Sequence, residues 1–149
     1  MNGVAALDLQ LPDSHNPPNL GSCSQQVTVF CDFDGPIVDV SDRYYATYKL
    51  GLADTQAVYR AAGVTLPVQQ LEKHQFWQMK QDRVPDAEIA MRSGLQGEQI
   101  DFFLGRVIEI VNRPELLTLD KMQPGIRWAL ARLHSQGIRL VLVTLRCQL

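Results

Sequence analysis

A short apolar run followed at once by two carboxylates stands near the start of the chain: Val27-Thr28-Val29-Phe30-Cys31-Asp32-Phe33-Asp34-Gly35. Residues 27–31 are rich in β-branched and aromatic side chains with almost no polar interruption, a pattern typical of a parallel strand buried on both faces. Asp32 and Asp34 are two positions apart, so on an extended chain both carboxylates point to the same side. We therefore expect a buried strand with an acidic site at its carboxyl end.

A helix and a second strand are predicted close to the end of the sequence. Pro124-Gly125 opens the helix, which extends from Ile126 to Gln136 with an apolar face, and Gly137 is expected to end it. The strand follows at Leu140 to Val143, again of the buried type, and Thr144 stands at its carboxyl end. The first strand therefore has a candidate partner.

Strand, long insert, helix and strand in this order make one βαβ unit with a segment inserted into its crossover. Such a crossover is expected to be right-handed and to leave the two strands parallel. Parallel strands hold their ligand at their carboxyl ends. Asp32, Asp34 and Thr144 are therefore expected at the same edge of the sheet, although they lie far apart in the sequence.

The insert between the strands, residues 41–119, is predicted to be helical. Its clearest helix is Gln99 to Val111, where apolar residues recur at helical spacing and form one stripe. Gly63 is expected to end an earlier helix as its C′ residue. The stripe consists of Ile100, Phe103, Leu104, Val107, Ile108 and Val111. The other expected helices span residues 42–50, 53–62, 68–81 and 86–93.

Residues 1–26 differ from the rest of the chain in being rich in Pro, Asn, Ser, Gly and Gln, without sustained periodicity. Pro12, Pro17, Pro18 and Gly21 exclude a regular element across most of this segment. We expect a disordered leader, and we expect it to be a mobile tail rather than a functional arm.

The composition fits one ordinary globular domain, or a small domain with an insertion. The chain has 149 residues, 46% of them hydrophobic, so a packed core is expected. Lys and Arg number 14 and Asp and Glu 16, scattered without a basic run, which argues against nucleic acid or an anionic membrane as partner. The three cysteines form neither a disulfide framework nor a zinc pattern. With no evident signal peptide, the expected location is the cytoplasm.

The residues at the expected sheet edge suit phosphoryl transfer. A carboxylate directly after a strand can attack phosphorus and form an aspartyl phosphate, a role open to Asp32. Asp34 can then act as general acid toward the leaving oxygen and as base toward water. The amide of Gly35 and the hydroxyl of Thr144 suit the phosphate oxygens. Because two carboxylates repel an anionic phosphate, a hard cation with oxygen ligands is required, and Mg²⁺ fits.

Two segments resemble motifs of the haloacid dehalogenase (HAD) superfamily. The residues from Val27 to Asp39 look like its first motif, and Leu140-Val-Leu-Val-Thr144 resembles its second. The resemblance implies an α/β fold, with a HAD-like Rossmannoid parallel sheet and an inserted α-helical cap. In this sequence the partial core would be residues 27–40 and 120–149, and the cap would be residues 41–119.

The resemblance also implies roles for individual residues. Asp32 would be the nucleophile and a metal ligand through its side chain, and Asp34 would be the acid/base and a metal ligand through its backbone carbonyl. Thr144 would bind the phosphoryl group. Since family members that dehalogenate do not need the second aspartate, Asp34 favours hydrolysis of a phosphate ester. The expected function is thus that of a Mg²⁺-dependent phosphatase of a small phosphorylated metabolite.

Two departures from the family pattern leave other interpretations open. Pro36 stands where a threonine is common, and the family's third motif, a lysine or arginine, and its fourth, an acidic pair, should follow Thr144, where five residues remain. We therefore expect a core truncated after the second motif, with two strands, impaired activity and self-association through the exposed sheet edge. The alternatives are a catalytically inactive fragment, serving as a binding or regulatory module or arising as a truncated gene product, and a phosphomutase.

The remaining polar and aromatic residues have structural interpretations. Cys31 is expected to be a small buried thiol, and Asp39 either a loop anchor or a charge at a helix N-terminus. Arg146 is expected to be a solvated loop residue, with contact to substrate as the alternative. The three histidines have no spacing that indicates a metal site or a triad. Five aromatic residues of the insert fit helix packing or a substrate pocket: Tyr44, Tyr45, Tyr48, Phe76 and Trp77.

Overall fold

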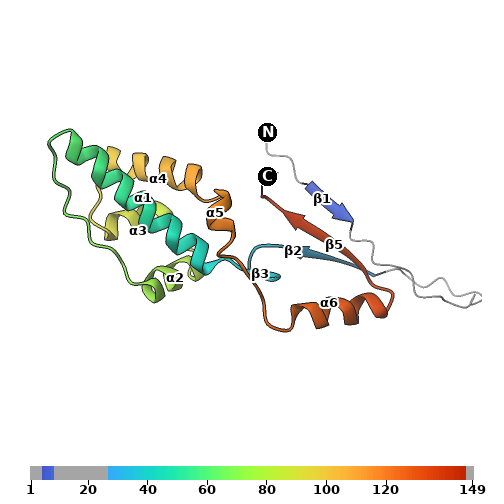
Figure 1. Cartoon of the computed structure of the whole chain (residues 1–149). Helices are drawn as coiled ribbons and strands as arrows, with labels where there is room; N and C mark the ends of the chain where they lie inside the picture. The colour runs from blue at the N-terminus through green and yellow to red at the C-terminus, as the bar shows by residue number, and fades with distance from the viewer. Residues whose placement is uncertain (1–4, 9–26, 147–149) are drawn as a thin grey trace, which may run out of the picture. The chain divides into compact units, whose positions relative to one another are not determined.

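The chain is a mixed α/β protein, shown in Figure 1 as a computed structural model that describes residues 5–8 and 27–146. Contacts divide it into two compact units. The strand unit contains the described residues up to Asp39 and from Lys121 onward, and the helical unit is Val40–Asp120. The helical unit begins one residue earlier and ends one residue later than the insert expected from the sequence.

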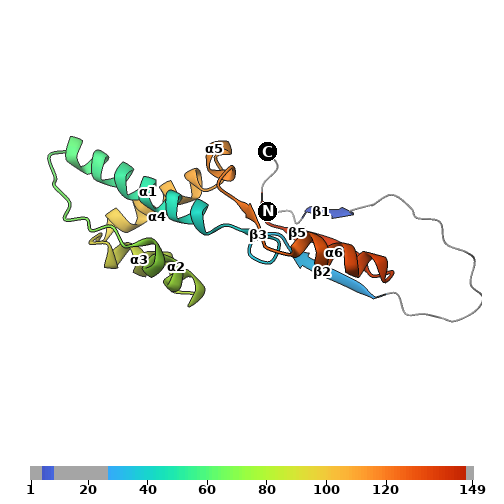
Figure 2. The same cartoon turned by 60° about the horizontal axis from the view of Figure 1, so that its bottom comes forward.

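The strand unit is built on a parallel pair of strands, β2 (Thr28–Asp32) and β5 (Arg139–Thr144). Helix α6 (Ile126–Ser135) leads into β5 and packs against it, as Figures 1 and 2 show. The register pairs Thr28 with Arg139 and Asp32 with Val143. The predicted order of strand, insert, helix and parallel strand is therefore confirmed.

A third strand, β1 (Ala5–Asp8), pairs antiparallel with the other edge of β5, so that the sheet order is β1-β5-β2. The prediction of a leader without structure over residues 1–26 is wrong for these four residues. The prolines behind that prediction, beginning with Pro12, all follow the strand and leave its backbone able to pair. The rest of the predicted leader, residues 1–4 and 9–26, lies outside the described residues.

The prediction that both strands are buried on both faces is wrong. Phe30, in the middle of β2, is 70% exposed, Cys31 is half-buried, and the residues of β5 from Leu140 to Thr144 are only half-buried. Among the described residues β2 pairs only with β5, and the apolar face of α6 is itself no more than half-buried. An apolar strand sequence indicates that the strand tends to be buried, but burial requires other elements that pack on its faces.

A second, two-stranded sheet forms where the chain leaves the strand unit and returns to it. Strand β3 (Val38–Asp39) pairs antiparallel with β4 (Lys121–Met122). This pairing places Asp39 opposite Lys121 within a sheet, directly before Val40, the N-cap residue of the following helix at Ser41–Ala61, so both interpretations of Asp39 stay open. Strands this short carry too little pattern to be predicted.

The helical unit contains five helices, and its largest is α1 (Ser41–Ala61), which packs alongside α4 (Glu98–Ile110). Tyr48, Phe76 and Phe103 are at most 4% exposed at the centre of its hydrophobic core. The shorter helices are α2 (Lys73–Gln81), α3 (Asp86–Arg92) and α5 (Pro114–Leu117). No helix in the described part of the chain is both long enough and apolar enough to cross a membrane.

Two helices predicted at residues 42–50 and 53–62 are in fact the single helix α1. The predicted break falls at Gly51, which instead lies inside the helix and lets α4 approach closely. A Cβ atom on Gly51 would lie 3.0 Å from Cε2 of Phe103. Gly63 ends the helix with a φ of +79°, as predicted for a C′ residue.

The helix predicted over residues 68–81 is shorter than expected and begins at Lys73. Glu72 and Gln75 form a capping box at its start. The preceding residues stay extended because their amides bond elsewhere in the unit: Gln69 N–H donates to the Ser93 carbonyl at 3.0 Å and Leu71 N–H to the Tyr48 hydroxyl at 2.9 Å.

The helices predicted at 86–93, 99–111 and 126–136 are confirmed to within a residue at each end. The predicted stripe of α4 is correct for Phe103, which is 2% exposed, and wrong for Ile108, which is 75% exposed. Ile110, absent from the predicted stripe, is fully buried. Ile110 lies seven positions after Phe103 and three after Val107, so helical periodicity places it on the same face, and the predicted stripe omitted it.

Candidate active site

The carboxyl ends of β2 and β5 lie side by side. Asp32 is paired in register with Val143, and the N–H of Phe33 donates to the Val143 carbonyl at 3.1 Å, which extends the ladder by one step. Thr144 is the next residue of β5 and is half-buried, while Asp32 is exposed. The strand pairing therefore brings the Asp32-Phe33-Asp34 segment and Thr144 to one edge of the sheet.

The loop after β2 folds back tightly on itself. The N–H groups of Ile37 and Val38 both donate to the Phe33 carbonyl, at 3.3 and 3.0 Å. The Gly35 N–H donates to the Val38 carbonyl at 2.8 Å, with a φ of +99° at Gly35 that favours glycine. Gly35 therefore serves the turn, and the predicted phosphate contact of its amide requires that this hydrogen bond be given up.

Gln123 holds the loop from the returning chain. Its side-chain Nε2 donates to the Gly35 carbonyl at 2.9 Å, and its backbone N–H donates to the Ile37 carbonyl at 2.9 Å. These two bonds fix the loop that carries Asp34 from a residue far away in sequence. Nothing in the sequence pattern around Gln123 signals this role.

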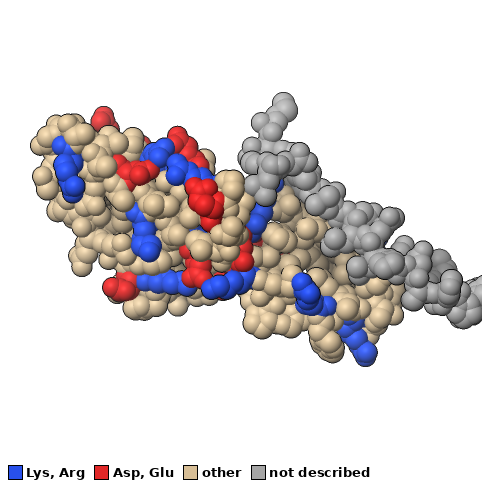
Figure 3. Space-filling view, in the orientation of Figure 1, with Lys and Arg blue, Asp and Glu red and all other residues tan. Residues whose placement is uncertain are grey.

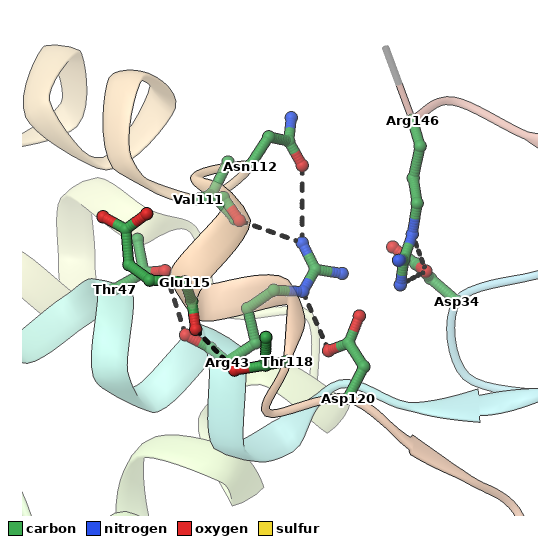
Figure 4. A network of polar contacts seen from close by, with 9 residues as sticks. All are labelled: Asp34, Arg43, Thr47, Val111, Asn112, Glu115, Thr118, Asp120 and Arg146. Atoms are coloured by element: carbon green, nitrogen blue, oxygen red, sulfur yellow. Dashed lines mark hydrogen bonds and ion pairs between the residues drawn. The ribbon is translucent and has the colours of Figure 1, made fainter. Parts of the chain in front are cut away.

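Arg146 has a partner at this edge that the sequence did not predict. Its Nε donates to Oδ1 of Asp34 at 2.7 Å, and its Nη2 contacts the same oxygen (Figure 4). Its guanidinium carbon lies 4.5 Å from the centre of the Phe33 ring, a cation–π contact. With a side chain 21% exposed, Arg146 is not the solvated loop residue expected from the sequence.

Thr144 is linked to the same arginine through the backbone. The Arg146 N–H donates to Oγ1 of Thr144 at 3.1 Å. This bond turns the chain at the end of β5 and directs Arg146 back toward the loop after β2. An arginine two residues beyond a candidate phosphate-binding threonine is the only signal in the sequence that could have indicated it.

The donor set at this edge consists of oxygen atoms. Among the described residues no three His, Cys, Asp or Glu side chains gather into a group that could hold a metal ion. Mg²⁺ commonly keeps several waters and binds through one or two carboxylates together with substrate phosphate. Asp32 and Asp34 fit that mode, and the Mg²⁺ site remains a prediction.

A cavity of about 210 Å³ lies within the helical unit. Three of the five aromatic residues considered for a substrate pocket, Tyr44, Tyr48 and Phe76, line it, together with Lys80 and Asp86, which form an ion pair of 2.7 Å. Tyr48 and Phe76 belong to the hydrophobic core at the same time. Packing thus accounts for these side chains, and the cavity leaves room beside them.

A buried ion pair joins the two ends of the helical unit. Nε of Arg43 donates to Oδ1 of Asp120 at 2.9 Å, with side chains 1% and 6% exposed, and Nη1 of Arg43 donates to the Val111 carbonyl at 3.1 Å (Figure 4). Figure 3 shows acidic and basic side chains mixed over the visible face of this unit. Arg43 and Asp120 are therefore structural residues of the helical unit.

Comparisons with known proteins returned nothing: no protein-family model, no curated protein and no solved structure matches the chain. The resemblance to the HAD superfamily therefore rests on the motifs at the ends of β2 and β5.

Proposed function

We propose that the chain has a HAD-like fold and acts as a Mg²⁺-dependent phosphatase of a small phosphorylated metabolite. Support comes from one observation above all, the parallel register of β2 and β5, in which Asp32 lies opposite Val143 and Thr144 follows directly. Residues more than a hundred positions apart thus meet at one sheet edge. In open sheets of parallel strands that edge is where ligands bind.

The proposed reaction has two steps. A carboxylate oxygen of Asp32 attacks phosphorus, the bond to the ester oxygen breaks, and that oxygen takes a proton from Asp34. Asp34 then accepts a proton from water as the water attacks the aspartyl phosphate, which releases inorganic phosphate and restores Asp32. Bound Mg²⁺ supplies charge neutralisation between the carboxylates and the phosphate. The Thr144 hydroxyl orients a phosphoryl oxygen.

The test is release of phosphate from 4-nitrophenyl phosphate with and without Mg²⁺. Chelation of Mg²⁺ and the Asp32→Asn variant should each abolish turnover, and Asp34→Asn should lower it by about 10²–10⁴-fold. Asp101→Asn, a carboxylate removed from the exposed side of α4, is the matched control and should be without effect. Undiminished turnover in Asp32→Asn would refute the nucleophile assignment.

The alternative function, a binding or regulatory module without catalysis, is separated by the same assay. It predicts a chain that unfolds cooperatively and shows no Mg²⁺-dependent turnover above the Asp32→Asn background. A phosphomutase would instead transfer the phosphoryl group to an added sugar phosphate and release little inorganic phosphate.

Two further expectations belong to this proposal. Self-association through the strand edge is supported by the position of β2, which among the described residues pairs only with β5 and is therefore an edge strand. A cytoplasmic location is supported by the three cysteines, whose spacing forms no disulfide framework.

A further inference from the structure

We infer that Arg146 is the phosphate-binding cation of this site, and that Asp34 holds its guanidinium until a phosphate monoester or inorganic phosphate takes it over. The inference rests on the proposed function for the identity of the ligand. Its physical basis is the contact of Arg146 with Asp34, Phe33 and Thr144 at the joined ends of β2 and β5.

The charge at this edge requires a cation for phosphate to bind. Asp32 and Asp34 each contribute a negative charge in the ionised state, and a phosphate monoester adds up to two more. A guanidinium stays protonated at any pH that proteins tolerate. Arg146 therefore brings a permanent positive charge to the sheet edge that carries both carboxylates.

The geometry of the pair suits an exchange of partners. The guanidinium presents parallel N–H donors that match a carboxylate and a phosphate equally well. The Asp34 and Arg146 side chains are 25% and 21% exposed, so a ligand from solvent can reach both. The Phe33 ring and the hydrogen bond from the Arg146 N–H to Thr144 Oγ1 keep the arginine at the strand ends after its contact with Asp34 is broken.

The exchange also connects binding to catalysis. While Oδ1 of Asp34 accepts a hydrogen bond from Arg146 Nε at 2.7 Å, that oxygen is engaged by a cation and is not available to the leaving oxygen. Transfer of the guanidinium to phosphate releases Asp34 when substrate is present. Arg146 is therefore a binding residue, and the transfer of its guanidinium from Asp34 to phosphate frees the proposed acid/base.

The experiment measures the affinity of the whole chain for inorganic phosphate by isothermal titration calorimetry at fixed Mg²⁺ and ionic strength. Arg146→Gln should weaken binding about 10- to 100-fold, as expected for a lost charge-assisted hydrogen-bonding group. Arg146→Lys keeps the charge without the fork and should fall between. Arg139→Gln removes the same charge from the opposite end of β5 and should change the affinity less than about 3-fold, in line with screening by salt.

Asp34→Asn provides the opposite signal, because it removes the partner that holds the guanidinium. It should tighten phosphate binding by about 10-fold, and this gain should vanish when Arg146→Gln is added. A gain that survives in the double variant would overturn the exchange, since it would be simple loss of negative charge. Equal affinity of Arg146→Gln, Arg146→Lys and the unmodified chain would overturn the role of Arg146.

This test and the test of the proposed function can fail separately. Phosphate binding that depends on Arg146, in a chain without ester turnover, would uphold the inference and reject the hydrolase. If Asp32→Asn abolishes turnover while the phosphate affinity does not depend on Arg146, the hydrolase is upheld and the inference is rejected.

Discussion

Gly51 lies in α1 at a tight contact with α4. A Cβ atom at this position would meet Phe103 Cε2 at 3.0 Å and Val107 Cγ2 at 3.3 Å. Gly51→Val should therefore lower the free energy of unfolding by about 1–3 kcal/mol through overpacking, measured by urea denaturation. Gly105→Val is the matched control, because nothing lies within 4 Å of a Cβ there, and it should change stability by less than about 0.5 kcal/mol.

Tyr48 makes both ring contacts and hydrogen bonds in the core. Its hydroxyl accepts a hydrogen bond from the Leu71 N–H at 2.9 Å and lies 2.8 Å from Ser93 Oγ. Since Ser93 donates its own proton to the Ile89 carbonyl, Tyr48 is the donor in the contact with Ser93. Burial raises the pKa of the Tyr48 hydroxyl above its ordinary value of 10.0.

This shift predicts a loss of stability at high pH. A pKa raised in the folded state means that the folded chain holds the proton more tightly, so the stabilisation is complete below about pH 10 and is lost as the pH rises beyond it. Tyr48→Phe should cost about 1–3 kcal/mol at neutral pH and should flatten the decline above pH 10. Thermal unfolding between pH 7 and 11 measures both effects.

Tyr59→Phe is the control for that experiment, since Tyr59 contacts Phe102 at the edge of the core. Its stability should fall above pH 10 as steeply as that of the unmodified chain. An equally steep decline in Tyr48→Phe would contradict the assignment to Tyr48.

At the scale of residues, sequence reasoning succeeded where a residue acts through its own backbone. Gly63 was predicted as a C′ residue because its conformational freedom is a property of glycine alone. Gly51 was left outside the helices predicted at residues 42–50 and 53–62, and its role in the structure depends on Phe103, 52 positions later. The pairing of Arg146 with Asp34 was missed for the same reason, since the two residues are 112 positions apart.

The ends of the helical unit are joined by the ion pair of Arg43 in α1 and Asp120 after α5. Because both side chains are almost fully buried, at 1% and 6% exposure, removal of one partner leaves an uncompensated charge. Arg43→Met should lower the free energy of unfolding by about 3–5 kcal/mol, and Arg43→Met with Asp120→Leu should recover most of it. Chemical denaturation of the two variants checks this.

The exposed pair of Arg92 and Glu88 on α3 serves as a control, with side chains 55% and 41% exposed. Arg92→Met should cost no more than about 0.5 kcal/mol. A comparable loss in Arg92→Met and Arg43→Met would show that burial does not set the strength of these pairs.

At the scale of elements, periodic pattern identified the type of most helices and missed how far two of them extend. The apolar pattern of α4 identified the helix correctly. Its prediction was wrong in the last turn, where Ile110 is buried and Ile108, which was expected to be buried, is exposed. In α2 the predicted start was too early because Gln69 and Leu71 find hydrogen-bond partners in Ser93 and Tyr48. Local propensity cannot register such tertiary partners.

In the molecule as a whole, the buried core is concentrated in the helical unit. Every described side chain less than 2% exposed belongs to it, whereas α6 has no buried residue and β2 exposes Phe30. Amides of α1 and α4 should therefore exchange with deuterium at least about 10-fold more slowly than those of β2 and α6, because opening free energies follow local burial. Hydrogen exchange with mass spectrometry on the whole chain measures this, and equal protection of β2 and α4 would contradict it.

The order of the elements and the positions of the two main strands followed from local pattern, because apolar runs, capping residues and turn residues act over a few positions. The meeting of Asp32 and Thr144 followed as well, since the rules of parallel crossovers leave few topologies to choose from. The pairing of β1, the exposure of Phe30, and the contacts of Arg146 with Asp34 and Gln123 with Gly35 emerged only from the folded chain. Each depends on which distant residue lies opposite, and neither composition nor periodicity encodes that.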